Sequence, residues 1–369
     1  MTTILATGDV GAKREDLQSM FAGCRHVLKR GGVVFGQLET TISDRGSRAP
    51  NARLAMRAPP ALAAVLGDTG YDVMSCAGNH CLDWGYEALD DTLEHMAKAG
   101  VKVCGAGSSI FEARRPALVR HGDLDIAFVA CSSILPEGYR ATESRAGCMP
   151  MRAHTVYEQV EHDQPGTRAR TVTFPHREDL ADLCDTIREA AEEADLVLLS
   201  IHWGLHMEEA TIADYQHKVA RAAVDAGANA VIGHHPHILK GVEILDGAPV
   251  FYSLGNFAIE QPHTWDPAIT ETESFRHLVS LNDDWDTSRV YMLPEDTRMT
   301  GIVRLLADSD GIRRVEFIPA WIGDDSVPRV LDPGDERFAT VAAYLRRISE
   351  SQGFTTRFTQ ADSRLVISK

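Results

Sequence analysis

The sequence lacks the features of a secreted, membrane-spanning or nucleic-acid-binding protein. Its seven cysteines are odd in number and form no C-x-x-C pair, which is typical of reduced thiols rather than of a disulfide framework. No apolar run reaches the roughly 18 residues of a membrane span, and the N-terminus, MTTILATGDVGAKRED, lacks the basic start and apolar stretch of a signal peptide. The net charge of −16 disfavours nucleic acid and anionic membranes as partners. We therefore expect a cytoplasmic protein that does not insert into a membrane and takes a small-molecule or peptide substrate.

The chain has 369 residues, 44% of them hydrophobic and 24% charged, so it is long enough for a large buried core. Short apolar runs alternate with amphipathic stretches, which predicts an α/β fold of parallel strands, right-handed crossovers and a sheet covered on both faces. Strands are expected in 3–9, 33–40, 71–80, 101–107, 124–132, 195–204, 228–237, 240–250 and 250–257, and helices in 15–32, 59–70, 85–100, 177–194 and 211–227.

The chain divides into three parts of one domain. Residues 1–262 carry the alternating pattern and form the expected core. Residues 263–300 have weak periodicity, many polar residues and three large aromatic side chains, and we interpret them as an insertion or lid over the site: Trp265, Phe275 and Trp285. Residues 301–369 complete the same domain with a hairpin around Ser309-Asp310-Gly311 and a final helix.

Polar side chains stand at the ends of several predicted strands: Asp9, Glu39, Asn79 with His80, and His202. A further segment, GHHPH, places His235 and His237 on either side of Pro236, where an extended backbone would point both rings the same way. A single histidine of this kind is more often a core residue than a ligand. Because strand ends of an α/β sheet meet at one edge, the combined set favours a metal site.

The donors in this set are two carboxylates, an amide oxygen and imidazoles. Such a mixture suits manganese, iron, zinc or calcium, as one ion or two. The candidate ligands are Asp9, Glu39, Asn79, His202, His235 and His237.

The stretch MSCAGNHCLDWG, residues 74–85, brings His80 and Asp83 close together in the sequence. Asp83 either orients His80 as a general acid or base, or caps the helix that follows. Cys76 and Cys81 flank the pair and are expected to pack the turn. Arg53 either binds a substrate carboxylate, as Arg57 also could, or lies on an exposed loop.

Several segments together resemble the CapA family, named for poly-γ-glutamate capsule synthesis, within the calcineurin-like metallophosphoesterases. They are TGDVGAKR, GQLET, AGNHCLDWG, SIHWG and VIGHHPHILKGVEILDGAPVFYSLGNF, and the resemblance covers about residues 2–260. It implies a four-layer α/β/β/α sandwich with the metal site at one end.

The resemblance also implies roles for single residues. Asp9 matches the first metal-binding aspartate and Glu39 the bridging carboxylate, while Asn79 matches the ligand of an Asn-His pair in which His80 assists the chemistry. The remaining ligands match His202, His235 and His237, which leaves His234 outside the ligand set. Gly11 stands where the superfamily has a histidine ligand, a loss that CapA-like proteins share. The sequence departs from the family pattern at Gln37, His206 and Lys240. These departures make one metal as compatible with the pattern as two.

Three functions use this set of residues. The preferred one is metal-dependent hydrolysis of a phosphoester or an amide bond, with metal-activated water and the His80–Asp83 acid/base pair. The alternative is peptide epimerisation, as in some relatives from peptide natural-product pathways, with a second pair, His237 and Asp9, exchanging an α-proton. In the third, the protein is a non-catalytic component of polymer assembly and the metal serves folding alone.

Overall fold

The structure is a computed structural model that describes residues 1–260, 270–282, 284–286 and 288–369. Its largest sheet is mixed: β1 pairs in parallel with β2 and β17, and antiparallel with β18. Along the main path the order is β21-β22-β19-β18-β1-β2-β5-β6, with β17 beside β1 and β20 beside β19. Its strands are β1 (Thr2–Gly11), β2 (Val33–Leu38), β5 (Val73–Ser75), β6 (Lys102–Cys104), β17 (Asn256–Ile259), β18 (Met299–Asp308), β19 (Gly311–Ile322), β20 (Pro328–Val330), β21 (Arg357–Ala361) and β22 (Arg364–Ser368).

A second sheet has the order β15-β16-β14-β13-β9-β8. Its central strands β9, β13, β14 and β16 run parallel, because helices connect several of them. The strands are β8 (Ala117–His121), β9 (Leu124–Ser132), β13 (Leu196–His202), β14 (Ala230–His234), β15 (Val242–Leu245) and β16 (Ala248–Phe251). β13 is buried at every position, so its run LVLLSIH shows no alternation of polar and apolar residues.

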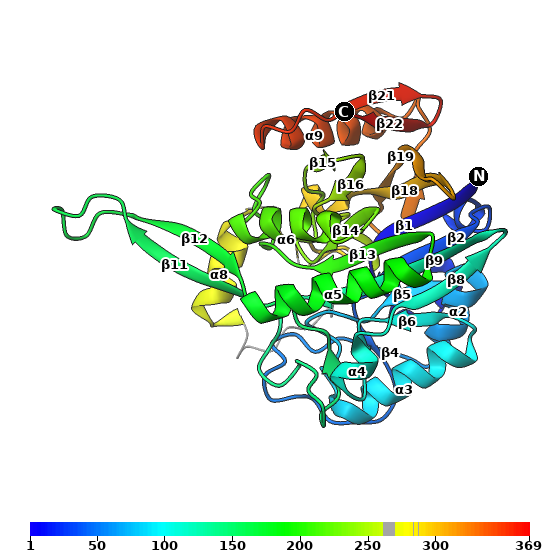
Figure 1. Cartoon of the computed structure of the whole chain (residues 1–369), viewed down its shortest axis with the longest axis horizontal. Helices are drawn as coiled ribbons and strands as arrows, with labels where there is room; N and C mark the ends of the chain where they lie inside the picture. The colour runs from blue at the N-terminus through cyan, green and yellow to red at the C-terminus, as the bar shows by residue number, and fades with distance from the viewer. Residues whose placement is uncertain (261–269, 283, 287) are drawn as a thin grey trace.

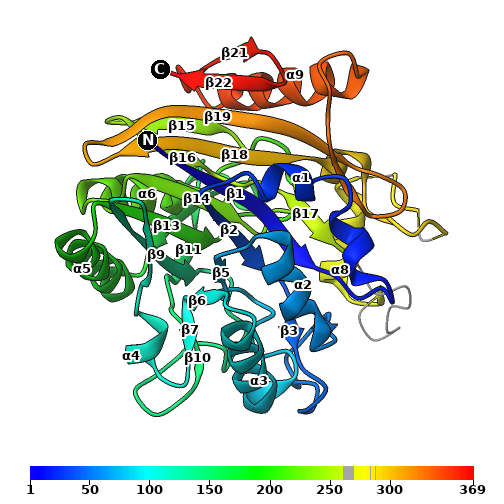
Figure 2. The same cartoon turned by 90° about the vertical axis from the view of Figure 1, so that its right-hand side faces the viewer.

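The two sheets pack face to face, and helices cover their outer faces (Figures 1 and 2). The rings of Phe35 on β2 and Phe128 on β9 stack with centroids 5.2 Å apart and mark the layer between the sheets. On one outer side lie α2 (Ala61–Thr69), α3 (Gly85–Lys98) and the short η1 (Leu17–Phe21) and α1 (Arg25–Leu28); on the other lie α5 (Arg177–Glu193) and α6 (Asp214–Asp225). This is the four-layer α/β/β/α sandwich. Each sheet is covered on both faces, as predicted, by helices on its outer face and by the other sheet on its inner face.

Most predicted elements of residues 1–260 are present, but 15–32 is not one helix. It contains η1 and the one-turn α1, separated by Ala22 to Cys24. The short elements of this part are β3 (Thr41–Ile42), β4 (Arg57–Ala58), β7 (Ala106–Gly107), β10 (Gly147–Cys148) and α4 (Ile110–Ala113).

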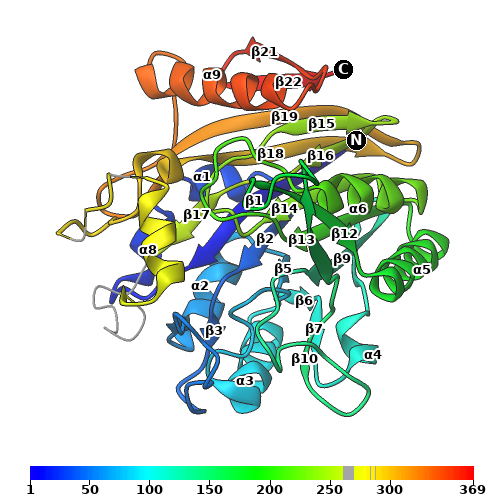
Figure 3. The same ribbon diagram turned by 90° about the vertical axis from the view of Figure 1, so that its left-hand side faces the viewer.

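A long hairpin between β9 and α5 has no counterpart in the sequence analysis. It is formed by β11 (Ala153–Gln159) and β12 (Ala169–Pro175), and it projects from the body of the molecule in Figure 1; Figure 3 views the molecule from the side on which it projects. Most of its residues are exposed, so its strands lack the apolar alternation by which a strand is found in a sequence.

The C-terminal part confirms the hairpin around Ser309-Asp310-Gly311, since β18 and β19 pair antiparallel on either side of it. The chain does not end in a helix, however. After α9 (Glu336–Ser351), β21 and β22 form another hairpin that pairs with β19. The predicted helix is present as α9, but the prediction that it closes the chain is wrong.

The proposed lid contributes α8 (Glu273–Ser280) and η2 (Glu295–Arg298). Trp265 is also part of the predicted lid. It lies outside the described residues, as does the rest of 263–269. Within the described residues, no helix is both long and apolar enough to cross a membrane. All seven cysteines are buried and unpaired, which confirms the expectation of free thiols.

Candidate metal centre

The candidate ligands come from the strand ends of both sheets. Asp9 lies in β1 at an irregularity in the pairing with β17, and Glu39 follows β2 directly. Asn79 lies in the loop after β5, whereas His202 ends β13 in the other sheet. The expectation that all of them share the edge of one sheet is wrong. The site lies where the two sheets meet, so neither sheet alone carries a complete set.

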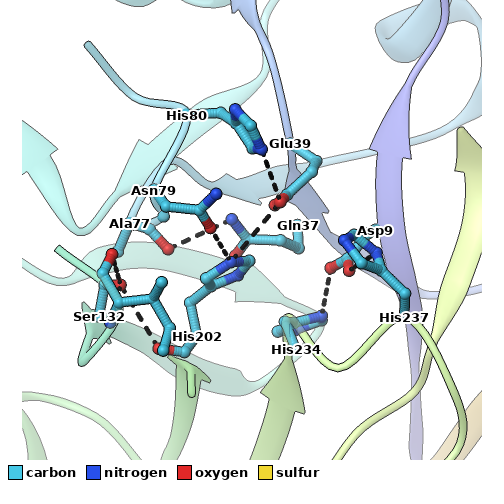
Figure 4. Close-up of polar contacts among 12 residues, drawn as sticks. Asp9, Gln37, Glu39, Ala77, Asn79, His80, Ser132, His202, His234 and His237 are labelled. Carbon is cyan, nitrogen blue, oxygen red and sulfur yellow. Dashed lines mark hydrogen bonds and ion pairs between the residues drawn. The ribbon is translucent and has the colours of Figure 1, made fainter. Parts of the chain in front are cut away.

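Three of these side chains converge most closely. One ligand atom each from Asp9, Glu39 and His202 lies within 4.8 Å of the other two, and all three residues are buried. Nε2 of His202 is 3.6 Å from Oε1 of Glu39 and 2.7 Å from Oδ1 of Asn79 (Figure 4). Two carboxylates, an amide oxygen and an imidazole thus face a common point.

The polar atoms at this point fit a cation. Both carboxylate oxygens of Asp9 and both of Glu39 are buried without a hydrogen-bond partner. Burial, together with the negative charge of Asp9, raises the pKa of Glu39 to about 7, while burial lowers the pKa of His202 to about 3 and keeps its ring neutral. Unpaired buried carboxylates are costly, and a divalent cation would compensate them. A neutral imidazole is the form that binds a metal.

The GHHPH segment is not extended. His235 has a φ of 96° and His237 a φ of 61°, values that residues other than glycine rarely adopt. The prediction that an extended backbone points both rings the same way is therefore wrong. The ring of His235 nevertheless lies 4.9 Å from that of His202, centroid to centroid, so the turn still brings it to the site.

His234 also reaches the centre. Its Nδ1 is 3.3 Å from Oδ1 of Asp9, and both of its ring nitrogens are buried without a hydrogen-bond partner. Nδ1 of His237 is 3.5 Å from Oδ2 of the same aspartate. Burial alone would raise the pKa of Asp9, but the two histidines hold it below its ordinary value. The family pattern had left His234 outside the ligand set; the structure places it in direct contact with Asp9.

His80 and Asp83 form a pair beside this centre. Nδ1 of His80 is 2.6 Å from Oδ2 of Asp83, and its Nε2 is 3.6 Å from Oε1 of Glu39. Burial would lower the pKa of His80, but the charge and hydrogen bond of Asp83 raise it to about 9. Asp83 does not cap α3, whose N-cap is Trp84, so the capping interpretation is wrong.

Three residues with no predicted role support the histidines. Tyr139 donates a hydrogen bond of 2.9 Å to Oδ1 of Asp83, and the backbone N–H of Met56 donates one of 2.7 Å to Oδ2. Asn256 accepts a hydrogen bond of 2.8 Å from Nδ1 of His237. Asn256 lies in the YSLGNF segment, and this motif could have identified it. Tyr139 lies in a loop with no motif.

A cavity of about 340 Å³ opens above the centre, and Glu39, Asn79, His80, His235 and His237 lie on its floor. Its walls are mostly apolar and include Leu54, Met56, Ile134, Pro136, Ile259, Phe275, Leu278, Trp285 and Leu293. Four of these, Phe275, Leu278, Trp285 and Leu293, come from the 263–300 segment, whose role as a lid stays a prediction. Among the described residues, Arg53 is the one lysine or arginine that lines the cavity, and Arg57 lies outside it.

One departure from the family pattern lies at this cavity, and a second supports the loop that carries it. His206 lines it, with its ring centroid 4.0 Å from that of His235 and 5.2 Å from that of His237. Lys240 is buried and donates hydrogen bonds to the carbonyl oxygens of Glu208 and, at 3.1 Å, Thr211. Lys240 therefore anchors the loop that carries His206.

Two face-to-face sheets with outer helices, and a carboxylate, amide and imidazole cluster at the junction of their strand ends, define a four-layer α/β/β/α protein with a candidate metal site. Within that class the sequence is more specific. Residues 3–261 match the family described as "Bacterial capsule synthesis protein PGA_cap", and the chain belongs to this family.

Similar proteins of this family come from several bacteria. The PGA biosynthesis protein CapA of Bacillus subtilis is 26% identical over 254 residues, which are 68% of this chain and 60% of that protein. A probable polyglutamine synthesis accessory protein of Mycobacterium tuberculosis is 31% identical over 229 residues, or 61% of this chain and 54% of that protein. The chain thus spans little more than half of the length of these relatives.

Similar solved structures are more distant in sequence. The calcineurin-like phosphoesterase YfkN from Bacillus subtilis has a TM-score of 0.42 at 13% identity, and covers 95% of this chain and 97% of its own. A putative 5'-nucleotidase from Staphylococcus aureus has a TM-score of 0.43 at 12% identity, and covers 95% of this chain and 58% of its own.

Proposed function

We propose that this protein is a metal-dependent hydrolase that cleaves an amide or peptide bond. The observation that carries the proposal is the His80–Asp83 pair, 2.6 Å apart, beside the cluster of Asp9, Glu39 and His202 on the floor of one cavity. An oriented imidazole and a cation site within reach of the same substrate are the two components that hydrolysis needs.

The metal would be held by Asp9, Glu39, Asn79, His202, His235 and His237, with His234 adjoining Asp9. When bound there, a divalent cation polarises the substrate carbonyl and lowers the pKa of water. The chain's own contribution is to fix the geometry: the ligands come from two sheets packed by a common core, so their separation is set by rigid elements.

His80 would donate the proton that the leaving amine requires. Asp83 accepts the Nδ1 proton, so Nε2 is the nitrogen that faces the cavity. Met56 and Tyr139 fix both oxygens of Asp83, and this holds the His80 ring in one orientation. An amine is a poor leaving group unless it is protonated, so this acid matters more for an amide than for an ester of an acidic alcohol.

The walls of the cavity favour an amide over a phosphoester. A phosphate group is usually recognised by several cationic or N–H donors. Here most lining side chains are apolar, and Arg53 is the single arginine or lysine among the described lining residues. An apolar group with one carboxylate nearby fits these walls better than a phosphorylated one.

The test is a comparison of generic phosphoesters with γ-glutamyl and peptide amides in the presence of added manganese. We expect cleavage of amides, and a loss of roughly 10² to 10⁴ in kcat for His80→Ala with unchanged metal content. Failure of every amide to be cleaved would contradict the proposal. If His80→Ala leaves both function and metal content unaltered, the protein is instead a non-catalytic component, as the accessory role named for the Mycobacterium tuberculosis relative suggests.

A second pair favours peptide epimerisation as another candidate. His237 lies 3.5 Å from Asp9 on the same cavity floor as His80. One imidazole would take the α-proton of a residue, leaving an enolate, and the other would return a proton to the opposite face, with no bond to nitrogen broken. Incubation of peptides in heavy water separates the two reactions: epimerisation adds deuterium to an intact peptide, and hydrolysis yields fragments.

A further inference from the structure

The hairpin of β11 and β12 carries an unusual share of the exposed apolar side chains. Among the described residues, four of the large exposed ones lie on it: Val156 (43% exposed), Tyr157 (72%), Val160 (64%) and Phe174 (37%). The hairpin projects from the molecule (Figure 1), and of the four side chains Phe174 lies near its base, where Lys218 of α6 is 4.9 Å from the ring centroid. Clustered exposed apolar side chains are typical of interaction surfaces.

One edge of the hairpin is anchored and the other is open. Thr173 on β12 is tied to the start of α6, because its N–H donates to Asp214 at 3.0 Å and its hydroxyl accepts from the N–H of Tyr215 at 3.0 Å. Among the described residues, β11 pairs with β12 alone. The outer backbone groups of β11 are therefore available to an added strand.

A cationic pocket of about 820 Å³ lies at the base of this hairpin. Its basic lining residues are Arg140, Arg145, Arg152, His154 and His176, and Glu137 is the acidic one. Arg152 is neutralised by Asp179, with nitrogen and oxygen 2.7 Å apart. The guanidinium of Arg140 makes no hydrogen bond or ion pair with any described residue, and Nε of Arg145 is buried without a partner.

The cationic pocket adjoins the cavity above the metal centre. Asn51, Pro136 and Glu137 line both, and the side chain of Asn51 donates to the carbonyl oxygen of Glu137 at 3.3 Å. His154 lies at the start of β11, so the cavity, the cationic pocket and the open strand edge follow one another.

We propose that the cationic pocket and the β11 edge together bind an extended acidic peptide segment. In this arrangement the acidic side chains lie against Arg140 and Arg145, the backbone pairs with β11, and apolar side chains on one face of the added strand cover Tyr157. The proposal rests on the proposed function in one respect: the segment is the flank of a substrate whose reacting residue occupies the cavity.

The charge distribution favours this occupant. The chain as a whole has a net charge of −16. Two arginines in one pocket that no carboxylate of the described residues neutralises are therefore a local exception that attracts acidic groups. Strand addition supplies backbone hydrogen bonds, and charge supplies the selectivity.

The test is fluorescence anisotropy with a short fluorescein-labelled peptide of alternating Glu and Val. We expect saturable binding that weakens with salt, and no binding of the Lys-Val counterpart. Arg140→Glu, alone and combined with Arg145→Glu, and Val156→Ser with Tyr157→Ser are each expected to weaken binding at least roughly tenfold. Arg140→Glu and the serine pair alter partly or largely exposed side chains, so they test the surface even if Arg145→Glu impairs folding.

Two controls separate this proposal from the catalytic one. Arg188→Glu reverses an exposed arginine on α5, and His80→Ala removes the catalytic imidazole; neither should change the dissociation constant. Binding without turnover would support the surface and contradict the hydrolase. Equal binding of both peptides, or equal binding by the wild type and Arg140→Glu, would contradict the proposed binding surface, with or without turnover. Hairpin-dependent self-association in sedimentation would contradict it as well.

Discussion

His80 and Asp83 are joined by a contact of 2.6 Å between Nδ1 and Oδ2, and Asp83 is in turn held by Tyr139 and by the N–H of Met56. The pair therefore links the loop after β5 to two other loops that approach it from elsewhere in the sequence. Because the ring of His80 is already held, one of its nitrogens is directed into the cavity before a substrate binds, and substrate binding need not orient it.

Asp83→Asn is expected to reduce kcat roughly hundredfold or more, because the His80 ring loses its orienting charge. Tyr139→Phe should have a smaller effect in the same direction, since the other oxygen of Asp83 remains bound. Steady-state kinetics give the kcat, and metal analysis of both variants should match the wild type. Loss of metal in Asp83→Asn would mean that Asp83 supports the ligands instead.

Glu39→Gln is expected to weaken metal binding, because it removes a buried charge that faces Asp9 and His202. Chelation by EDTA should lower the Tm of the wild type, and added manganese, zinc or calcium should restore it, since a ligand bound by the native state alone stabilises that state. The Tm of Glu39→Gln should respond little to either treatment. Glu94→Gln, on the exposed face of α3, is the matched control.

Gly8→Ala is expected to destabilise the protein by about 1–3 kcal/mol and to weaken metal binding. A Cβ at this position would lie 2.1 Å from the backbone oxygen of Gly255, so β1 must shift at the residue before Asp9. Denaturant unfolding measures the first effect and metal titration the second. Gly334→Ala, where a Cβ meets nothing within 4 Å, is the control.

Trp285→Ala tests whether the 263–300 segment acts as a lid. Its side chain lines the cavity and packs against a small cluster of Met207, Tyr291, Leu293 and Ile322. We expect a several-fold rise in KM for apolar amides, with a smaller change in kcat, because apolar contact is lost away from the reacting atoms. Tyr86→Ala, at an exposed aromatic residue on α3, should leave KM unchanged.

Cys24 gives a prediction for alkaline pH. Burial raises the pKa of its thiol to about 12 despite Arg25, whereas the unfolded chain ionises near 9.0. Above about pH 9 the unfolded state therefore binds fewer protons than the native state, and the free energy of unfolding falls as the pH rises. Between pH 8 and about 11, the free energy of unfolding measured with urea should fall with pH less steeply in Cys24→Ala than in the wild type, by up to ~1.4 kcal/mol per pH unit. An unchanged slope would contradict this assignment.

Much of the candidate site is accessible from the sequence because metal ligands follow predicted strands. Asp9, Glu39, Asn79 and His202 each stand at or after an apolar run, and the structure brings all four together. The pairing of His80 with Asp83 follows from their separation by three residues. Asn256 and Tyr139 were missed because their partners, His237 and Asp83, are distant in the sequence and no local pattern links them.

The α/β class, the positions of most strands and the chemical groups at the strand ends can be predicted from the sequence, because these depend on local periodicity and on residue type. Only the folded structure shows that these groups come from two sheets, that the GHHPH segment turns through positive φ, and that an apolar cavity and a cationic pocket adjoin. These features arise from packing between segments far apart in the chain. Local sequence carries no information about the distance between such segments until the shared core fixes it.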